Sequence, residues 1–152
     1  MIFSDYIFVR VVIGLLGVCG FFVAEHIRNH KAKQVPLVCM VGFDCHTVVH
    51  SDYSKLFGVP VEILGMIYYA VVALGYLFLT FTFGETLPKL VVDLAAGFSL
   101  IAFLFSVYLI FVQVFVLKKG CSWCFVSAFI SISIFLLTLN AYHIDFLTQI
   151  FK

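Results

Sequence analysis

Long uncharged stretches separate the segments that hold nearly all of the charged residues. The stretches cover residues 6–24, 63–83, 94–117 and 121–142, and only the first is interrupted, by Arg10. A bilayer core needs about 20 apolar residues in helical form, so each stretch can span a membrane. A membrane strand would need only about 9–11 residues and would alternate polar with apolar positions. The pattern therefore predicts an all-α membrane protein, a four-transmembrane-helix bundle. The predicted helices occupy about residues 6–25, 60–83, 90–117 and 121–142.

The composition supports this fold class. Hydrophobic residues make up 64% of the chain and charged residues 11%, against about 45–50% and about 25% in soluble domains. So few charges exclude a soluble enzyme and a disordered chain. The net charge of +1 provides no basic field, so no nucleic-acid partner is expected. Residues 1–152 are predicted to form a single integral membrane domain. The alternative for the first stretch is a cleaved signal peptide, but its apolar run is long and no A-x-A site follows Ala24.

The connection between the first two predicted helices, residues 26–59, is long for a helical bundle. Loops of this length are usually functional or disordered. This one contains apolar residues, so we expect it to pack on the bundle, with a short helix over residues 46–57. The side chains expected to point toward the bundle are Val48, Val49, Leu56 and Phe57. Because consecutive helices cross in opposite directions, this loop and the hinge at 118–120 lie on the same side of the membrane.

Four of the five cysteines lie on that side. Cys39 and Cys45 are in the long loop, and a C-x-x-C motif, Cys121 to Cys124, opens the last helix. Free N–H groups and the dipole at a helix N-terminus stabilise a thiolate, and the close spacing allows cycling between dithiol and disulfide. The sequence therefore predicts a redox-active face, and its three possible pairings stay open. A structural disulfide or apolar filling are the alternatives, and Cys19, inside the first helix, is interpreted as packing.

Histidines offer a competing hypothesis. His26 and His30 are spaced i, i+4, as are His46 and His50, which places each pair on one helix face. Together with the loop cysteines they could hold zinc or copper. The alternative function is therefore a metal-binding membrane protein, and a third possibility is a structural membrane protein held by disulfides. No His lies near the C-x-x-C motif in the sequence, so no metal site is predicted.

The order of these motifs resembles the vitamin K epoxide reductase family. The features that carry the resemblance are Cys39, Cys45, Ser51, the dipeptide Phe57-Gly58 before the second helix, and the C-x-x-C of Cys121 and Cys124. Residues 65–69 and 106–118 are also similar to that family. Another four-helix family of disulfide-forming membrane enzymes has the opposite order, with its C-x-x-C in the first loop.

The resemblance implies a quinone-dependent thiol-disulfide oxidoreductase that supports disulfide bond formation. A thioredoxin-like periplasmic or lumenal protein would give electrons to Cys39, with Cys45 as its mate. Cys45 would exchange with Cys121, and Cys124 would face the acceptor, a quinone of the ubiquinone, menaquinone or vitamin K type. The residues that match quinone-binding positions of the family are Ser51, Tyr53, Phe57, Leu64 and Tyr68.

Two departures narrow this implication. Ala128 stands where family members that reduce vitamin K epoxide have a Tyr, and Val61 aligns near their Asn. Both changes remove hydrogen-bond donors, so a plain quinone is the expected acceptor. Many bacterial members carry a fused thioredoxin-like domain. This chain is expected to be the stand-alone form, which makes the partner a separate protein.

The orientation signals conflict. Six basic residues lie on the cysteine side and three on the other, and the richer side is usually cytoplasmic. The cysteine side has Arg28, Lys31, Lys33, Lys55, Lys118 and Lys119, and the other side Arg10, Lys89 and Lys152. Disulfide chemistry and the resemblance both favour an extracytoplasmic active site. We expect an integral protein of a bacterial inner membrane, or of the endoplasmic reticulum membrane in a eukaryote.

Overall fold

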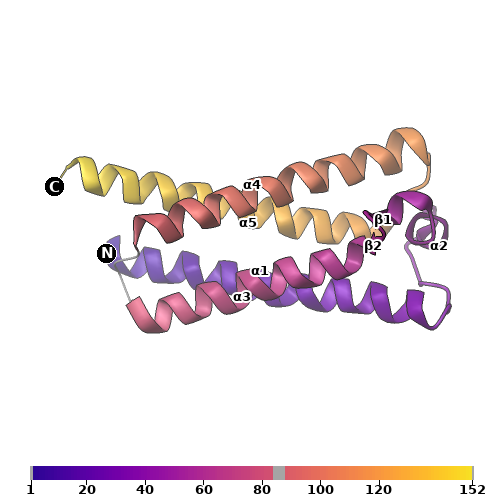
Figure 1. Cartoon of the computed structure of the whole chain (residues 1–152), viewed down its shortest axis with the longest axis horizontal. Coiled ribbons are helices and arrows are strands. Elements are labelled where there is room, and N and C mark those ends of the chain that lie inside the picture. The colour runs from indigo at the N-terminus through magenta and orange to yellow at the C-terminus, as the bar shows by residue number, and fades with distance from the viewer. Residues whose placement is uncertain (1, 84–87, 152) are drawn as a thin grey trace.

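Four long helices form the protein. The computed structural model describes residues 2–83 and 88–151. The helices are α1 (Ile2–Ala32), α3 (Val61–Phe83), α4 (Lys89–Phe111) and α5 (Ser122–Ile150). In the described part of the chain, four helical segments are long and apolar enough to cross a membrane. They lie side by side, with α1 against α3 and α4 against α5 (Figure 1). The predicted four-helix membrane bundle is confirmed.

The helix ends depart from the prediction. Helix α1 continues to Ala32 and α5 to Ile150, because backbone hydrogen bonds continue past the first charged residue as long as water or side chains solvate the charges. The α-helical geometry of α4 ends at Phe111. The chain then forms a π-helical turn, η2 (Val112–Val116), after which Leu117 N–H donates to Val112 O at 2.9 Å. This wider turn has no counterpart in the prediction, and it lies just before the C-x-x-C motif.

Small residues allow α1 and α3 to approach each other closely at Gly17 and Gly20. A Cβ atom at Gly20 would lie 2.5 Å from the Tyr69 ring, and one at Gly17 would lie 2.9 Å from the backbone nitrogen of Ala73. Close approach at small residues is the usual means of packing helices in membranes. From this position the Tyr69 hydroxyl donates to the backbone oxygen of Ser127 on α5, at 2.6 Å. The contact joins α1, α3 and α5 beside the start of α5.

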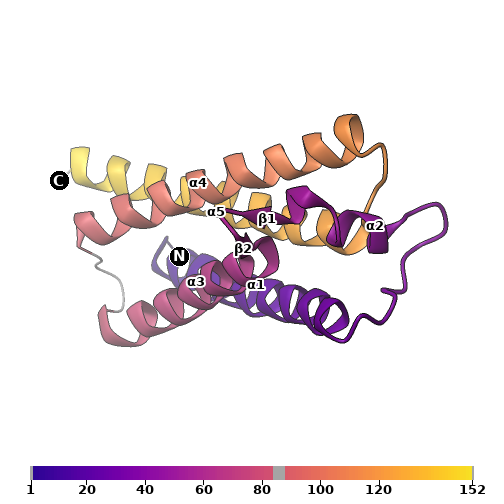
Figure 2. The same ribbon diagram turned by 45° about the vertical axis from the view of Figure 1, so that its right-hand side comes forward.

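The loop between α1 and α3 covers one end of the bundle, opposite both termini (Figures 1 and 2). It contains α2 (Cys45–Val49), a 3₁₀ turn η1 (Asp52–Ser54), and a hairpin of β1 (Lys55–Leu56) and β2 (Val59–Pro60). The strands are antiparallel, with Lys55 opposite Pro60. The prediction of one helix over residues 46–57 is wrong beyond its first turn, because the chain reverses at the hairpin.

Within the loop, Phe57 departs most from the prediction. It was expected to point toward the bundle, yet it occupies the hairpin turn and is 97% exposed. Phe57 has φ of 52° and Gly58 has φ of 82°, the positive angles that a tight two-residue hairpin turn demands. Both flanking strands are fixed by their pairing, so the side chain at the tip extends away from the protein.

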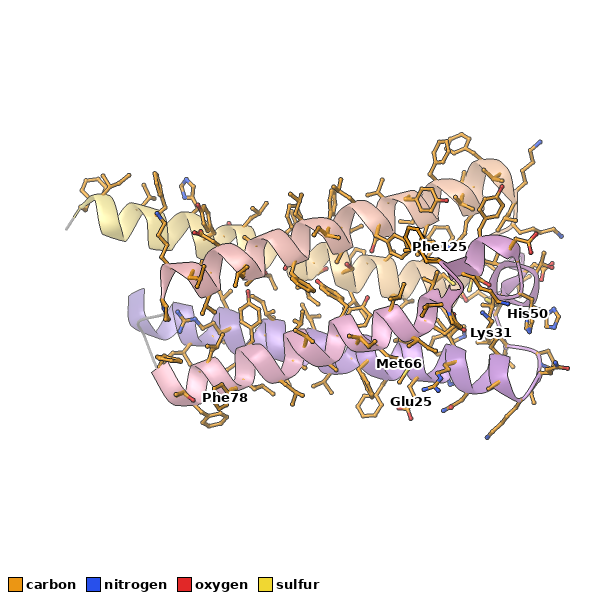
Figure 3. The ribbon with its side chains drawn as sticks, in the orientation of Figure 1. Glu25, Lys31, His50, Met66, Phe78 and Phe125 are labelled. Atoms are coloured by element: carbon orange, nitrogen blue, oxygen red, sulfur yellow. A yellow bond between two sulfur atoms is a disulfide. The ribbon has the colours of Figure 1, made fainter. Side chains whose placement is uncertain are left out.

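The outer surface of the bundle is apolar. Phe78, 65% exposed, points away from α3, whereas Lys31 lies at the loop end (Figure 3). Arg10, the charge inside the first stretch, is buried in the bundle, as expected for a charge at membrane depth. Cys19 is a free, exposed cysteine on α1, so the prediction that it packs inside the protein is wrong.

Candidate active site

The C-x-x-C motif begins at the N-cap of α5. Cys121 has an extended backbone, with φ of −118°, and its Sγ accepts a hydrogen bond from the Cys124 N–H at 3.4 Å. Its side chain is completely buried. The side-chain hydrogen bond from Cys124 lowers the pKa of Cys121; burial opposes this, and the N–H groups of Cys124 and Trp123 lower the pKa further. A thiol of lowered pKa is ionised to a greater extent and exchanges with disulfides through its thiolate.

The loop cysteines form a disulfide directly above this thiol. Cys39 and Cys45 are joined, with their Cα atoms 6.2 Å apart, whereas Cys121 and Cys124 are free thiols. The sulfur atoms of Cys39, Cys45 and Cys121 all lie within 4.8 Å of one another. Cys45 is 1% exposed and Cys39 is half-buried. Of the three possible pairings, the structure contains Cys39–Cys45, with the C-x-x-C thiol next to it.

Backbone and ionic contacts fix the loop to the hinge before α5. The Asp44 N–H donates to Gly120 O at 2.9 Å, and the Lys119 ammonium lies 3.4 Å from the Asp44 carboxylate. Asp44 also caps α2, since its carboxylate accepts from Thr47 N–H at 3.1 Å and from the Thr47 hydroxyl at 2.7 Å. The hydrogen bond from the Thr47 hydroxyl is the main cause that lowers the pKa of Asp44. These contacts hold Cys45 in place over α5.

Aromatic side chains provide further contacts between the loop and the start of α5. The Trp123 indole N–H donates to Val38 O at 2.9 Å, and the Phe43 and Phe125 rings meet edge to face with centroids 6.0 Å apart. Gly120 lies under Phe43 so closely that a Cβ atom there would be 2.7 Å from the ring. The contact of the hinge with the loop therefore leaves no room for a side chain at Gly120.

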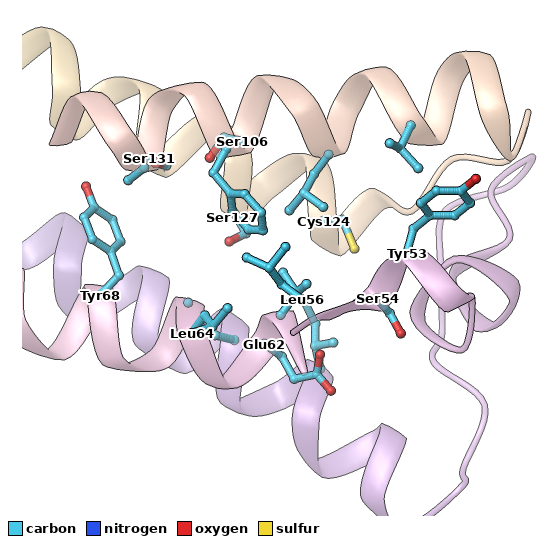
Figure 4. A pocket seen from close by; sticks show the side chains of 18 of the residues that line it. Tyr53, Ser54, Leu56, Glu62, Leu64, Tyr68, Ser106, Cys124, Ser127 and Ser131 are labelled. Carbon is cyan, nitrogen blue, oxygen red and sulfur yellow. The ribbon is translucent and has the colours of Figure 1, made fainter. Parts of the chain in front are cut away.

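A cavity of about 380 Å³ lies between the helices below the loop. Small-molecule sites in proteins are of this size and are mostly apolar. Cys124 lines the cavity, as do four of the five residues predicted at a quinone site (Figure 4). Those four are Ser51, Tyr53, Leu64 and Tyr68. Phe57 is not among the lining residues, because the hairpin turn directs it outward.

Two hydroxyl groups at the cavity lie deep in the bundle, on α3 and α5. Tyr68 Oη and Ser131 Oγ are buried, and neither makes a hydrogen bond of ordinary geometry in the described part of the chain. By contrast, Ser51 Oγ donates to Val48 O at 2.7 Å, so its proton is already committed. Buried polar groups without partners are uncommon. A ring with apolar faces and polar oxygens would fit this lining, and a quinone has both.

An ion pair that the sequence did not predict stands at the cavity's loop end. The Lys31 ammonium lies 2.9 Å from the Glu62 carboxylate, with both side chains mostly buried. Lys31 also donates to Ser54 Oγ at 3.2 Å, and Ser54 Oγ donates to Ser51 O at 2.7 Å. Lys31, one of the basic residues counted on the cysteine side, is thus mostly buried and paired. No pattern in the sequence pairs two residues on different helices.

Gln113 is a further residue that sequence reasoning missed. It is buried in the π-helical turn, it lines the cavity, and its Oε1 accepts from the Cys121 N–H at 3.2 Å. The sequence contains one signal that could have identified it, because Gln113 is the single amide side chain within the uncharged stretch of residues 94–117.

The histidines do not assemble a metal site. His26 packs on Trp123 and on His30, and His46 stacks on His50, with centroids 4.2–4.5 Å apart. Among the described residues, the one group with metal-ligand spacing is Cys39, Cys45 and Cys121. No His joins it, and two of its three sulfurs are already in a disulfide.

The geometry is that of a membrane thiol–disulfide site: a loop disulfide, a buried thiol of lowered pKa within reach of it, and a second thiol on an apolar cavity. A search of the curated proteins gave no match to the chain. The family model described as "Vitamin K epoxide reductase family" matches residues 7–139, which is most of the chain. The protein therefore belongs to the vitamin K epoxide reductase family and is a membrane oxidoreductase.

Proposed function

We propose that the protein transfers two electrons from the dithiol of a thioredoxin-like protein to a membrane quinone and thereby supports disulfide bond formation. One observation carries the proposal: Cys121 lies between the loop disulfide and Cys124, and Cys124 lines the cavity. A continuous path of sulfur atoms therefore leads from the loop surface to an apolar site inside the bundle.

The first exchange takes place at the loop. A partner thiolate attacks Cys39, the S–S bond to Cys45 breaks, and Cys45 leaves as a thiolate. The second partner thiolate then attacks the mixed disulfide and releases Cys39, so the partner is oxidised and the loop pair is reduced. The choice of Cys39 as the point of entry follows from its greater accessibility, since Cys45 is 1% exposed. Thiol–disulfide exchange needs such access for the attacking sulfur.

The second exchange starts from an oxidised C-x-x-C pair. The Cys45 thiolate attacks Cys121, the bond to Cys124 breaks, and Cys124 leaves as a thiolate. Cys39 then attacks Cys45, which restores the loop disulfide and releases Cys121. The state with a loop disulfide and two free thiols is the product of this transfer, with both electrons now held by Cys121 and Cys124.

The last step regenerates the C-x-x-C disulfide. When bound, a quinone accepts two electrons and two protons and becomes a quinol. Cys124 faces the cavity and supplies the reacting sulfur, and Cys121 closes the disulfide with it. The balance is partner dithiol plus quinone to partner disulfide plus quinol. Neither Val61, which lines the cavity, nor the buried Ala128 has a side-chain donor, which favours a plain quinone such as ubiquinone, menaquinone or vitamin K over an epoxide.

The side of the membrane is also a proposal. The loop end would face the periplasm of a bacterium, or the lumen of the endoplasmic reticulum, because disulfides persist in oxidising compartments. The distribution of basic residues favours the opposite orientation. Labelling of Lys33→Cys in a Cys19→Ala background of intact cells decides between them, since Lys33 is exposed at the loop end.

The proposal is tested with purified protein in detergent. Reduced thioredoxin-like donor and ubiquinone-1, a ubiquinone with one isoprene unit, are mixed with protein, and quinone absorbance is followed. We expect Cys124→Ala to abolish quinone reduction and Cys19→Ala, on the outer surface of α1, to leave it unchanged. Quinone reduction by Cys124→Ala at the wild-type rate contradicts the proposal. Failure of the wild-type protein with ubiquinone, menaquinone and vitamin K analogues alike also contradicts it.

A further inference from the structure

Gln113 connects the C-x-x-C motif to the cavity. It lies in the π-helical turn η2, is 4% exposed, and belongs to the cavity lining. Its backbone oxygen accepts from Lys119 N–H at 3.1 Å, so the turn is also tied to the hinge. Single π-helical turns are rare and are frequently found at functional sites. Here the wider turn places an amide side chain between a reactive cysteine and the ligand space.

The chemistry of the amide fixes its orientation. The Cys121 N–H is buried and needs an acceptor, and Gln113 Oε1 provides it at 3.2 Å. Only the oxygen of the amide can accept a hydrogen bond, so the NH₂ group must point to the other side. No residue in the described segments accepts a hydrogen bond from that NH₂ group. Gln113 therefore has an unused pair of donors at the cavity.

We propose that Gln113 donates a hydrogen bond to a carbonyl oxygen of the quinone-class ligand while its Oε1 positions Cys121. This inference rests on the proposed function. Two-electron reduction places negative charge on that oxygen, and a fixed N–H donor in a water-poor site stabilises such charge. One planar amide then holds the backbone of Cys121, which closes the disulfide with Cys124, and the acceptor ring in a defined relation, as a thiol-to-quinone transfer needs.

Other donors of the cavity are less suited to this role. The Ser51 hydroxyl is committed to Val48 O, and the Tyr69 hydroxyl to Ser127 O. Ser131 lies seven residues beyond Cys124 on α5, about 10 Å deeper at 1.5 Å per residue. The Tyr68 phenol lies near Ser131 at that depth. Gln113 is bonded to the cysteine whose sulfur contacts the backbone of Cys124, so its NH₂ group is a donor at the reacting end of the cavity.

The test measures binding and hydrogen bonding directly. Trp123 is the single tryptophan of the chain and precedes Cys124, so quenching of its fluorescence by ubiquinone-1 reports binding at the site. The infrared carbonyl band of bound ubiquinone-1, labelled with ¹³C at the carbonyls, reports the hydrogen bond. Wild type is compared with Gln113→Met and with the matched control Gln34→Met, whose residue is exposed outside the cavity.

We expect the carbonyl band of bound ubiquinone-1 to lie at lower frequency in wild type and in Gln34→Met than in Gln113→Met. We also expect Gln113→Met to raise the Kd about fivefold to tenfold, which corresponds to one neutral hydrogen bond. A Gln113→Met protein with the wild-type band and Kd overturns the inference and leaves the proposed function intact. Wild type that binds neither ubiquinone-1 nor the menaquinone and vitamin K analogues contradicts the proposed function, and the inference with it.

A second measurement needs no substitution at Gln113. Glutamine labelled with ¹⁵N gives side-chain amide resonances for the three glutamines of the chain, which Gln34→Met and Gln149→Met assign by elimination. The Gln113 amide proton is expected to move downfield with duroquinone and to stay in place with durene, the same tetramethyl ring without carbonyl oxygens. Equal shifts with both compounds, or none with duroquinone, overturn the inference even if Gln113→Met does not fold.

Discussion

The Lys31 ammonium lies 2.9 Å from the Glu62 carboxylate, and this contact joins the end of α1 to the first turn of α3. Both side chains are mostly buried, with exposed fractions of 15% and 7%. The pair lies at the cavity, because Glu62 is one of its lining residues. Through Ser54, the ammonium also reaches the polar turn that carries Ser51. One ion pair thus holds two helices and the loop in a fixed relation around the ligand space.

Removing one partner of this pair is expected to destabilise the protein. Lys31→Met leaves the Glu62 carboxylate buried without a counter-charge, which costs about 3 kcal/mol in buried pairs. The double variant Lys31→Met/Glu62→Met removes both charges and should regain most of that loss. Thermal unfolding of detergent-solubilised protein measures the effect, with Lys33→Met as the control because Lys33 is exposed. A double variant less stable than Lys31→Met would contradict this account of the pair.

The pH dependence of thiol exchange should follow Cys121. Its pKa is lowered chiefly by the side-chain hydrogen bond from Cys124, so its thiolate persists at a pH at which an ordinary cysteine is protonated. Exchange therefore falls only as the pH drops through this lowered pKa. In Cys124→Ala the stabilising hydrogen bond is lost, and the midpoint should move to higher pH. Alkylation of Cys121 by iodoacetamide as a function of pH, resolved from that of Cys124 by peptide mass in a Cys19→Ala background, measures both midpoints, and an unchanged midpoint contradicts the assignment.

The sequence determines the four spans because membrane insertion depends on apolar length, and residues 63–83 and 94–117 meet that requirement without a charge. Helix ends are less predictable, since the α1 backbone continues to Ala32 among charged side chains. Phe57 shows that an apolar side chain alone does not predict burial. Its apolar side chain predicted burial, but the positive φ angles of the hairpin turn place it at the surface of the protein.

The candidate site also has features that the sequence predicts and features that it does not. The four cysteines that we propose to react were predicted from their spacing and from the position of the C-x-x-C at a helix start, which are local features of the chain. The Lys31–Glu62 pair and the bond from Cys121 to Gln113 depend on how helices pack and on the π-helical turn. No local pattern encodes such contacts, so they could be found only in three dimensions.

The contact of Gly120 with Phe43 predicts a loss of exchange when a methyl group is added. In Gly120→Ala the Cβ would lie 2.7 Å from the Phe43 ring, so the loop must shift away from Cys121. Displacement of about 1 Å can cost as much as 100-fold in rate, and we expect quinone reduction to fall at least tenfold. Gly75→Ala is the matched control, since an added Cβ there meets nothing within 4 Å.

The double variant Phe43→Ala/Gly120→Ala separates displacement from a change in the hinge backbone. Phe43→Ala removes the ring that the new methyl group would strike, so the loop can return toward Cys121 and activity should recover in part. A double variant as slow as Gly120→Ala would show that the hinge itself, and not the loop contact, needs glycine.

The last prediction concerns Asp44, which both caps α2 and binds the hinge. Its carboxylate accepts two hydrogen bonds from Thr47 and lies 3.4 Å from the Lys119 ammonium. Asp44→Ala loses the cap, worth about 1 kcal/mol, together with the ion pair. Asp44→Asn keeps one oxygen to accept from the Thr47 N–H and loses the charge and the second acceptor oxygen, and an exposed ion pair contributes little. Because the cap orients the first turn of α2, and Cys45 is its first residue, we expect Asp44→Ala to expose the Cys39–Cys45 disulfide.

Reduction of that bond by dithiothreitol should then be several times faster in Asp44→Ala than in wild type, with Asp44→Asn close to wild type. Equal acceleration in both variants would instead assign the restraint to the charge on Asp44 and its pairing with Lys119.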